Sequence, residues 1–180
     1  DNSCTLIKCE KQKLSGDIEI PEKVNGYVVK KIANGVFKSC EELTSVSMPK
    51  TITDMGRSTF ANCINLTTVK LSEKITKVDY KDFSGCSNLK EITIPENAES
   101  IGRYAFEDCT KLDTVNMNDK VVEIGDYAFK GCTALESIKL NEGIIRIRSG
   151  AFNGCTNLKT ISFPESLQKI YDYSFQGCTV

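Results

Sequence analysis

The chain of 180 residues contains no histidine. Histidine is the commonest general base in enzymes, and it activates the nucleophile in Ser–His and Cys–His sites. The chain also has no C-x-x-C pair, which together with the missing histidine argues against a zinc site. A glycine-rich phosphate-binding loop is likewise absent. We therefore predict no catalytic residues, no metal site and no cofactor, and we expect that the chain is not an enzyme.

Charge and hydrophobic runs argue against two further classes of function. The 23 basic and 24 acidic residues leave a net charge of −1, and no cluster of Lys and Arg is interleaved with aromatic residues. Such clusters mark nucleic-acid-binding surfaces, so we expect no nucleic-acid partner. No apolar run approaches the roughly 18 residues of a membrane span, so we expect no membrane insertion.

What the chain does have is a strict repeat. Phenylalanine recurs every 23 residues, and a cysteine follows each phenylalanine by three positions. A fixed period of this length indicates a solenoid, whose units bury their apolar faces by stacking on one another. The phenylalanines are Phe37, Phe60, Phe83, Phe106, Phe129, Phe152 and Phe175. The cysteines are Cys40, Cys63, Cys86, Cys109, Cys132, Cys155 and Cys178.

The residues after each cysteine follow the spacing L-x-x-V-x-L, as in Leu43, Val46 and Met48. The last two apolar positions are two apart, which is the period of side chains on one face of a strand. The segment around each phenylalanine, as in RYAFEDC, is too short for a three-turn helix, so one helical or 3₁₀ turn is expected there. The predicted fold class is an α/β-type repeat solenoid. Its short strands form a parallel sheet on the concave face of a curved array, with turns and single helical or 3₁₀ turns on the other side.

Two glycine columns accompany the repeat. Glycine permits positive φ, so both columns are expected to lie at tight turns. Asn62 and Asp108 replace glycine in the second column, and these residue types tolerate the left-handed region. The first column contains Gly56, Gly102 and Gly125, and the second contains Gly85, Gly131, Gly154 and Gly177.

The two ends of the chain differ from the repeats. Residues 1–31 lack the Phe and Cys columns, and the segments SCTLIKC and LSGDIEIP predict a β-hairpin-like capping segment. Residues 32–180 are predicted to form an array of six full 23-residue units and a partial seventh. An uncapped solenoid exposes an apolar end. Because Val180 comes just before the next leucine is due, we expect the natural chain to continue past it or a partner to make an end-to-end contact there.

The nine cysteines fall into two groups. Cysteine is among the most buried residue types, so the seven repeat cysteines are predicted to be buried thiols. Cys4 and Cys9 lie outside the repeat. On one strand they would be about 16 Å apart, too far for a disulfide, whereas a turn between them would allow one. The sequence leaves both states open.

The segments IGRYAFEDCTKLDTVNM and GDIEIPEKVNGYVVKKI resemble the BspA-like class of leucine-rich repeats, and the likeness covers about residues 16–180. The resemblance implies a curved leucine-rich-repeat array. It also implies a surface-exposed or secreted protein of host-associated anaerobic bacteria or some protists. The function it implies is adhesion to host matrix proteins, to epithelium or to other microbes. The expected location is extracellular or at the cell surface, and the expected partner is a protein or glycan on a host or microbial surface.

The outward side chains of the predicted strands are the first candidate binding site. Solenoids commonly bind ligands on the extended surface that such strands line. Across the stack these side chains form two polar columns rich in hydroxyl groups, which suit hydrogen bonding to a glycan or an extended polypeptide, or solvation alone. The first column is Ser45, Thr68, Glu91, Thr114, Ser137 and Thr160, and the second is Ser47, Lys70, Thr93, Asn116, Lys139 and Ser162.

The second candidate is a convex patch of tyrosines, Tyr104, Tyr127 and Tyr173, which occupy one column. Tyrosine is enriched at interface hot spots, although an aromatic column also packs between repeats. A further column of acids just past the strand suggests a solvated turn or a weak site for divalent cations. These acids are Glu73, Glu96, Asp119, Glu142 and Glu165.

The sequence thus favours a surface ligand-binding or adhesion module. The alternatives are a structural spacer or self-assembling stalk, or the non-catalytic repeat region of a larger protein.

Overall fold

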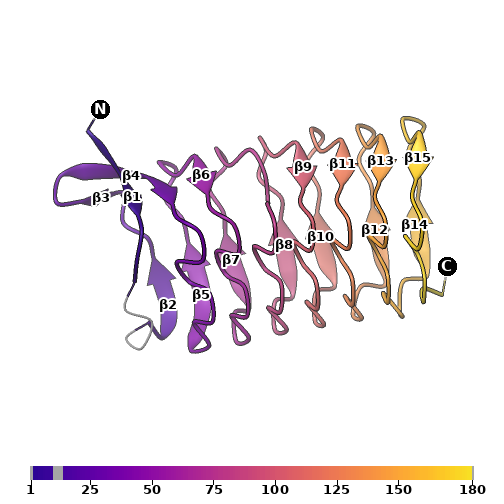
Figure 1. The fold of residues 1–180 in the computed structure, drawn as a ribbon, viewed down its shortest axis with the longest axis horizontal. Helices are drawn as coiled ribbons and strands as arrows, with labels where there is room; N and C mark the ends of the chain where they lie inside the picture. The colour runs from indigo at the N-terminus through magenta and orange to yellow at the C-terminus, as the bar shows by residue number, and fades with distance from the viewer. Residues whose placement is uncertain (1, 10–13, 180) are drawn as a thin grey trace.

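The computed structural model describes residues 2–9 and 14–179, which form a β-solenoid (Figure 1). Successive turns of the chain lie side by side along the long axis, and the two termini lie at opposite ends (Figure 1). The turns place short strands in two ladders, and nearly all of the strand pairs are parallel. The turn that contains Val78 contributes only the isolated bridge of Val78 with Ile101 to the second ladder. The repeat solenoid with a parallel sheet, expected from the 23-residue period, is therefore confirmed.

The first ladder contains the strands expected from the L-x-x-V-x-L segments. Their inward residues, such as Val46 and Ile92, are buried, and their outward residues are mostly Ser, Thr and Lys. The strands are β2 (Gly16–Glu19), β5 (Leu43–Ser47), β7 (Thr68–Lys70), β8 (Glu91–Thr93), β10 (Thr114–Asn116), β12 (Ser137–Lys139) and β14 (Thr160–Ser162). They pair as β2-β5-β7, β8-β10 and β12-β14.

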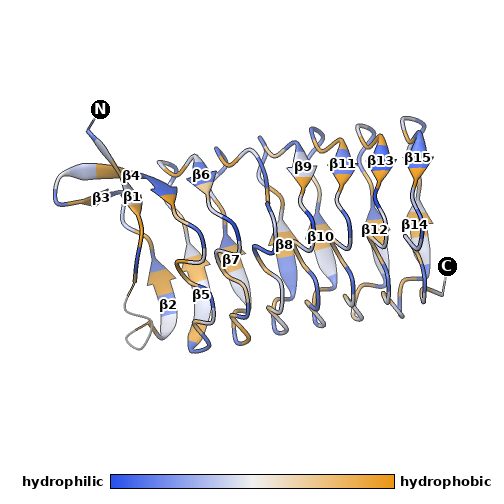
Figure 2. Ribbon diagram, viewed as in Figure 1, coloured by the Kyte–Doolittle hydropathy of each residue, from blue (hydrophilic) through white to orange (hydrophobic). Residues whose placement is uncertain are grey.

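The second ladder is built from shorter strands. Each of its two-residue strands from β9 onward has a polar first residue and an apolar second residue, which Figure 2 shows as blue followed by orange in β11, β13 and β15. Its strands are β1 (Ser3–Leu6), β3 (Lys23–Val24), β4 (Tyr27–Ile32), β6 (Asp54–Met55), β9 (Ser100–Ile101), β11 (Glu123–Ile124), β13 (Arg146–Ile147) and β15 (Lys169–Ile170). The first four form one sheet and the last four another.

The N-terminal segment extends both ladders. β1 pairs in parallel with β4, and β2 pairs in parallel with β5. The segments SCTLIKC and LSGDIEIP therefore contain strands, but each strand pairs with a later one; residues 10–13 between them lie outside the described residues. The hairpin of this region is β3-β4, whose turn places Asn25 and Gly26 at positive φ. The domain boundary at residue 31 stays a prediction.

The phenylalanine column is the centre of the core. From Phe37 to Phe175 each ring stacks on the next, with centroids 5.1–5.4 Å apart and interplanar angles of 2–9°. Phe60, Phe83, Phe106, Phe129 and Phe152 are fully buried. Every repeat therefore covers its neighbour's aromatic ring, which explains why the spacing of 23 residues is strict.

The helical or 3₁₀ turn expected around each phenylalanine is absent, and so is the α/β character. Within the described residues the chain contains strands and turns but no helix. The amides of Tyr104, Phe106 and Asp108 donate to carbonyls of the next repeat, at Asp126, Ala128 and Lys130. Tyr104 and Asp108 also have positive φ, which a right-handed helix excludes. Hydrogen bonds between repeats thus take every second amide, and only the amides in between, such as those of Ala105 and Glu107, bond along the chain to the residue three positions earlier.

The first glycine column was expected at positive φ, and that expectation is wrong. Gly56, Gly102 and Gly125 have no positive φ; a Cβ added to any of them would lie 2.5–2.9 Å from atoms of the preceding repeat. At these three positions glycine allows a close approach of two backbones, although Arg148 occupies the same column later in the array and keeps the hydrogen bond to the preceding repeat. The second column does have positive φ, which is shared by Asn62 and Asp108 as predicted.

The repeat cysteines are not joined by disulfides, and all except the half-buried Cys178 are buried. From Cys63 to Cys178 each thiol donates a hydrogen bond to the carbonyl of the phenylalanine one repeat earlier, at 3.0–3.2 Å. That carbonyl also accepts a hydrogen bond from the amide of the cysteine in its own repeat. The Phe83 carbonyl, for example, accepts from the Cys86 amide and from the Cys109 thiol. The thiol is therefore both a small apolar group and a donor. Cys4 and Cys9 are free and partly buried.

Thiol reactivity should follow this burial. Burial raises the pKa of Cys155 to about 12 and raises the pKa of Cys109 and Cys132 well above the ordinary value. Because the thiolate is the reactive form, a water-soluble thiol reagent should modify Cys4 and Cys9 first in native protein and the buried cysteines only after denaturation. Mass spectrometry of the labelled peptides measures the order. Early labelling of Cys109 in folded protein, or a bridge between two repeat cysteines, would contradict the buried column.

Candidate functional site

The outward side chains of the first ladder form one continuous set of positions, which we call the strand face. Strand register places Ser45 beside Thr68, and Ser47 beside Lys70. The same register joins β8 to β10 and β12 to β14, so both predicted columns are present. The concave shape of this face stays a prediction.

Most strand-face residues from β7 onward are exposed, while Ser45 and Ser47 are half-buried. Several of them are already hydrogen-bonded to one another. The Asn116 amide donates to Glu91 at 2.6 Å and to Thr93 at 3.3 Å, and Thr114 donates to Asp113 at 2.7 Å. These bonds orient the polar groups before any ligand arrives, which lowers the entropy cost of binding.

β2 adds two acids that the sequence columns omitted. Asp17 and Glu19 lie beside Ser45 and Ser47 in the parallel register. Asp17 accepts hydrogen bonds from Ser45 at 2.6 Å and Thr44 at 2.8 Å, and these bonds hold the pKa of its carboxyl group below the ordinary value. Because β2 precedes the first Phe and Cys, the period could not reveal it. The alternation of polar and apolar residues in GDIEI could have revealed this strand.

Two hollows interrupt the strand face where neighbouring strands are unpaired. The first, of about 490 Å³, lies between β7 and β8, and the second, of about 250 Å³, lies between β10 and β12. The first is lined by Thr67, Thr68, Val69, Lys90, Glu91 and Thr93. The second is lined by Val115, Asn116, Met117, Asp119, Lys139, Leu140 and Asn141. The structure thus brings five of the predicted site residues to hollows, while Ser137, Thr160 and Ser162 lie on the paired strands β12 and β14.

The tyrosine column is discontinuous. Tyr104 and Tyr127 stack with centroids 5.3 Å apart, and Tyr80 contacts Tyr104 edge-on at 6.1 Å. In the repeat after Tyr127 this column is occupied by Gly150, and a Cβ on Gly150 would lie 2.3 Å from the Tyr127 ring. Tyr173 therefore lies apart from the other two predicted residues, with 64% of its surface exposed.

Two cations lie over this tyrosine stack. Lys81 Nζ is 5.0 Å from the centroid of the Tyr104 ring, and the Arg103 guanidinium is 4.7 Å from it. Arg103 also donates to the Tyr104 hydroxyl at 3.1 Å. We call Tyr80, Lys81, Arg103, Tyr104 and Tyr127 the tyrosine edge.

The acid column past the strands does not gather its members into a metal site. Across residues 2–9 and 14–179, no group of three or more His, Cys, Asp or Glu residues could hold a metal ion. Glu73 pairs with Lys50 at 3.4 Å. In the same part of the chain, no helix is long and apolar enough to cross a membrane.

Comparison with known families gives one match. A model described as "BspA type Leucine rich repeat region" matches residues 10–136 and 122–180, with six copies of the repeat. Together these matches cover far more than half of the chain. No curated protein matches it.

Solved structures of other repeat proteins share the fold. A leucine-rich repeat protein from T. pallidum is 27% identical with a TM-score of 0.90, over 98% of this chain and 82% of that one. A leucine-rich repeat protein from Bacteroides ovatus is 28% identical with a TM-score of 0.69, over 92% and 52%. The pneumococcal vaccine antigen PcpA is 20% identical with a TM-score of 0.55, over 92% and 51%, which shows a shared fold alone. The chain spans about half the length of the latter two proteins.

Proposed function

The chain belongs to the BspA-type leucine-rich repeat family, and from this premise we propose that its strand face binds a protein or glycan displayed on a host or microbial surface. The role is that of a binding module and not of an enzyme, in keeping with the chemistry of a chain without histidine. We also propose an extracellular or cell-surface location, on the strength of the family alone.

The two hollows of the strand face carry this proposal. They interrupt an otherwise paired ladder, and they bring long polar side chains beside strand edges whose amide and carbonyl groups have no neighbouring strand. Glu91 and Thr93 line the first hollow, and Asn116 and Lys139 line the second. A polar polymer laid across the strands would meet hydrogen-bonding groups at both.

Affinity at a single array should be modest. The strand-face residues include no aromatic residue or arginine, which are the side chains that dominate strong interfaces. We expect a dissociation constant in the micromolar range or weaker, and useful adhesion through display of many copies on one surface.

The tyrosine edge is the second candidate surface, and one observation favours it. Its stacked rings and overlying Lys81 and Arg103 supply the residue types that are enriched at interface hot spots. Two other roles remain as alternatives for the chain: a spacer or self-assembling stalk, with end-to-end contact through the last repeat, and a non-catalytic part of a larger protein.

A fourfold substitution separates the two surfaces. Alanine at Lys70, Glu91, Asn116 and Lys139 should leave stability within about 0.5 kcal/mol, because these are exposed positions. The same variant should lose most of the attachment of protein-coated beads to purified matrix proteins or to partner cells. Four exposed residues of matching types away from the strand face provide the control, and their substitution should leave attachment unchanged. These control residues are Lys74, Glu99, Asn157 and Lys169.

One result would reject the strand face. If attachment survives the fourfold change but disappears when Tyr104 and Tyr127 are replaced by serine, the tyrosine edge is the binding surface. If neither variant changes attachment, the chain binds these targets through neither of the two surfaces.

A further inference from the structure

One repeat carries a carboxyl group in the core. The residue immediately before each core phenylalanine is uncharged in every repeat except one, where it is Asp82. Asp82 has no exposed surface. The other residues of this column are Val36, Thr59, Ala105, Ala128, Ala151 and Ser174.

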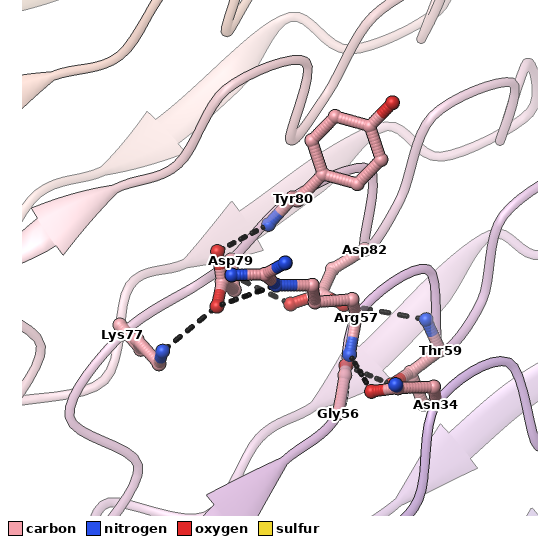
Figure 3. A network of polar contacts seen from close by, with 8 residues as sticks. All are labelled: Asn34, Gly56, Arg57, Thr59, Lys77, Asp79, Tyr80 and Asp82. Atoms are coloured by element: carbon pink, nitrogen blue, oxygen red, sulfur yellow. Dashed lines mark hydrogen bonds and ion pairs between the residues drawn. The ribbon is translucent and has the colours of Figure 1, made fainter.

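The Asp82 carboxyl group bridges two repeats. One oxygen accepts the amide of Asp79 in its own repeat at 2.8 Å, and the other accepts the amide of Thr59 in the preceding repeat at 3.2 Å. Figure 3 shows the group beside Asp79, with its bond to Thr59 dashed. A side chain here takes hydrogen bonds that backbone carbonyls take elsewhere.

The second ladder is open at this place. At the position of Asp79, other repeats donate their amide to the preceding repeat: Gly102 to Val78 at 2.7 Å, and Arg148 to Ile124 at 2.9 Å. The Asp79 amide turns to Asp82 instead, and β6 pairs with β4 but not with the next repeat. Because Arg148 keeps the bond with a bulky side chain, a side chain in this column does not by itself open the ladder. The Asp82 carboxyl group accounts for the opening.

The first ladder is open between the same two repeats, since β7 and β8 are unpaired. The joint between the Phe60 and Phe83 repeats therefore lacks strand pairing in both ladders. It retains the ring stacking of Phe60 on Phe83 at 5.4 Å and the hydrogen bonds of the turns, such as that from Phe60 to Asp82. We call this junction the Asp82 joint.

Charged groups of both repeats surround the joint. The Asp79 carboxylate forms ion pairs with Lys77 at 2.8 Å and with Arg57 at 3.6 Å. These three residues help to line a hollow of about 350 Å³. The following repeat presents neutral Ala105 in the Asp82 column. Burial raises the pKa of Asp82 to about 7; the charge of Asp79 adds to the rise, while the two amide donors and Lys77 oppose it.

We propose that Asp82 makes this joint pH-sensitive, so that the two halves of the array are held together more tightly when the carboxyl group is protonated than when it is ionised. In the unfolded chain the group titrates near its ordinary value of 3.8. A folded-state pKa above the unfolded one means that the folded protein binds the extra proton between the two values. The contribution of Asp82 to stability is therefore greatest at acidic pH and falls as the pH rises toward and through 7.

The test compares wild type with Asp82→Ala. Alanine fits this column, since Ala105, Ala128 and Ala151 occupy it in other repeats. Denaturant unfolding at pH 5 and pH 8 measures how the difference in unfolding free energy between the two proteins changes. From pH 5 to pH 8 the folding equilibrium constant of wild type should fall relative to the variant, by up to about a hundredfold. Asp172→Ala, which removes an exposed carboxylate, should show no such change relative to wild type.

A second measurement needs no variant to fold. The carbon-13 resonance of the Asp82 carboxyl group in intact protein should titrate with a midpoint near 7. A titration midpoint near 4 would overturn the proposal. So would a difference in unfolding free energy between wild type and Asp82→Ala that is the same at both pH values.

Discussion

Phe106→Ala should destabilise the protein by about 3–5 kcal/mol. Phe106 has no exposed surface and is stacked between Phe83 at 5.4 Å and Phe129 at 5.2 Å. The substitution removes a large buried side chain and leaves a cavity that both neighbouring rings border. Since repeats contact mainly their neighbours, this loss should also divide the array into two units that melt separately.

Calorimetry and denaturant unfolding of Phe106→Ala measure both effects. Phe175→Ala is the matched control, because Phe175 stacks on Phe152 alone, meets Phe163 edge-on at 5.8 Å and is half-buried. Its loss should cost clearly less. A Phe106→Ala protein that unfolds within about 0.5 kcal/mol of wild type would show that the ring stack is not the core.

Gly125→Asn should have the next largest effect, a destabilisation of about 1–3 kcal/mol. A Cβ at Gly125 would lie 2.8 Å from backbone atoms of Gly102 and Ile101, so the backbone would have to shift at this point of close approach. Asparagine relieves the strain of positive φ but not a steric overlap, so it distinguishes the two reasons for which a glycine is required.

Gly154→Asn supplies the comparison. Gly154 has φ +73°, and its added Cβ would meet Gly131 at an ordinary 3.7 Å. Asn62 already occupies this column with φ 60°, so stability should change little. Equal losses at Gly125 and Gly154, measured by thermal unfolding, would contradict the close-approach explanation.

The period of the sequence was sufficient to predict the solenoid, the first ladder and the core columns. These features repeat because every repeat buries the same apolar positions against its neighbours, so each additional copy strengthens the pattern. The strand-face columns of β5 to β14 were predictable for the same reason: Thr and Ser alternate there with Val and Ile.

Features that depend on contacts between repeats were beyond the pattern. The segment RYAFEDC is compatible with a helical turn until the amides of Tyr104 and Phe106 find carbonyls in the next repeat. Gly125 resembles a turn glycine for the same reason, since its requirement lies in a neighbour 23 residues away.

The candidate site was predictable only in part. The polar columns could be read from sequence, but the hollows could not, because the missing pairs β7-β8 and β10-β12 have no counterpart in the repeat pattern. Asp82 could have been noticed as the one acid in a column of small residues, yet its two amide donors come from the folded joint.

The most direct test of binding at the strand face is amide hydrogen exchange of the protein with and without a purified matrix protein that retains wild-type-coated beads. We expect slower exchange in residues 67–71, 90–94, 113–117 and 136–140, where β7, β8, β10 and β12 border the two hollows. Slower exchange confined to Tyr80, Arg103, Tyr104 and Tyr127, with those strands unchanged, would contradict the proposal.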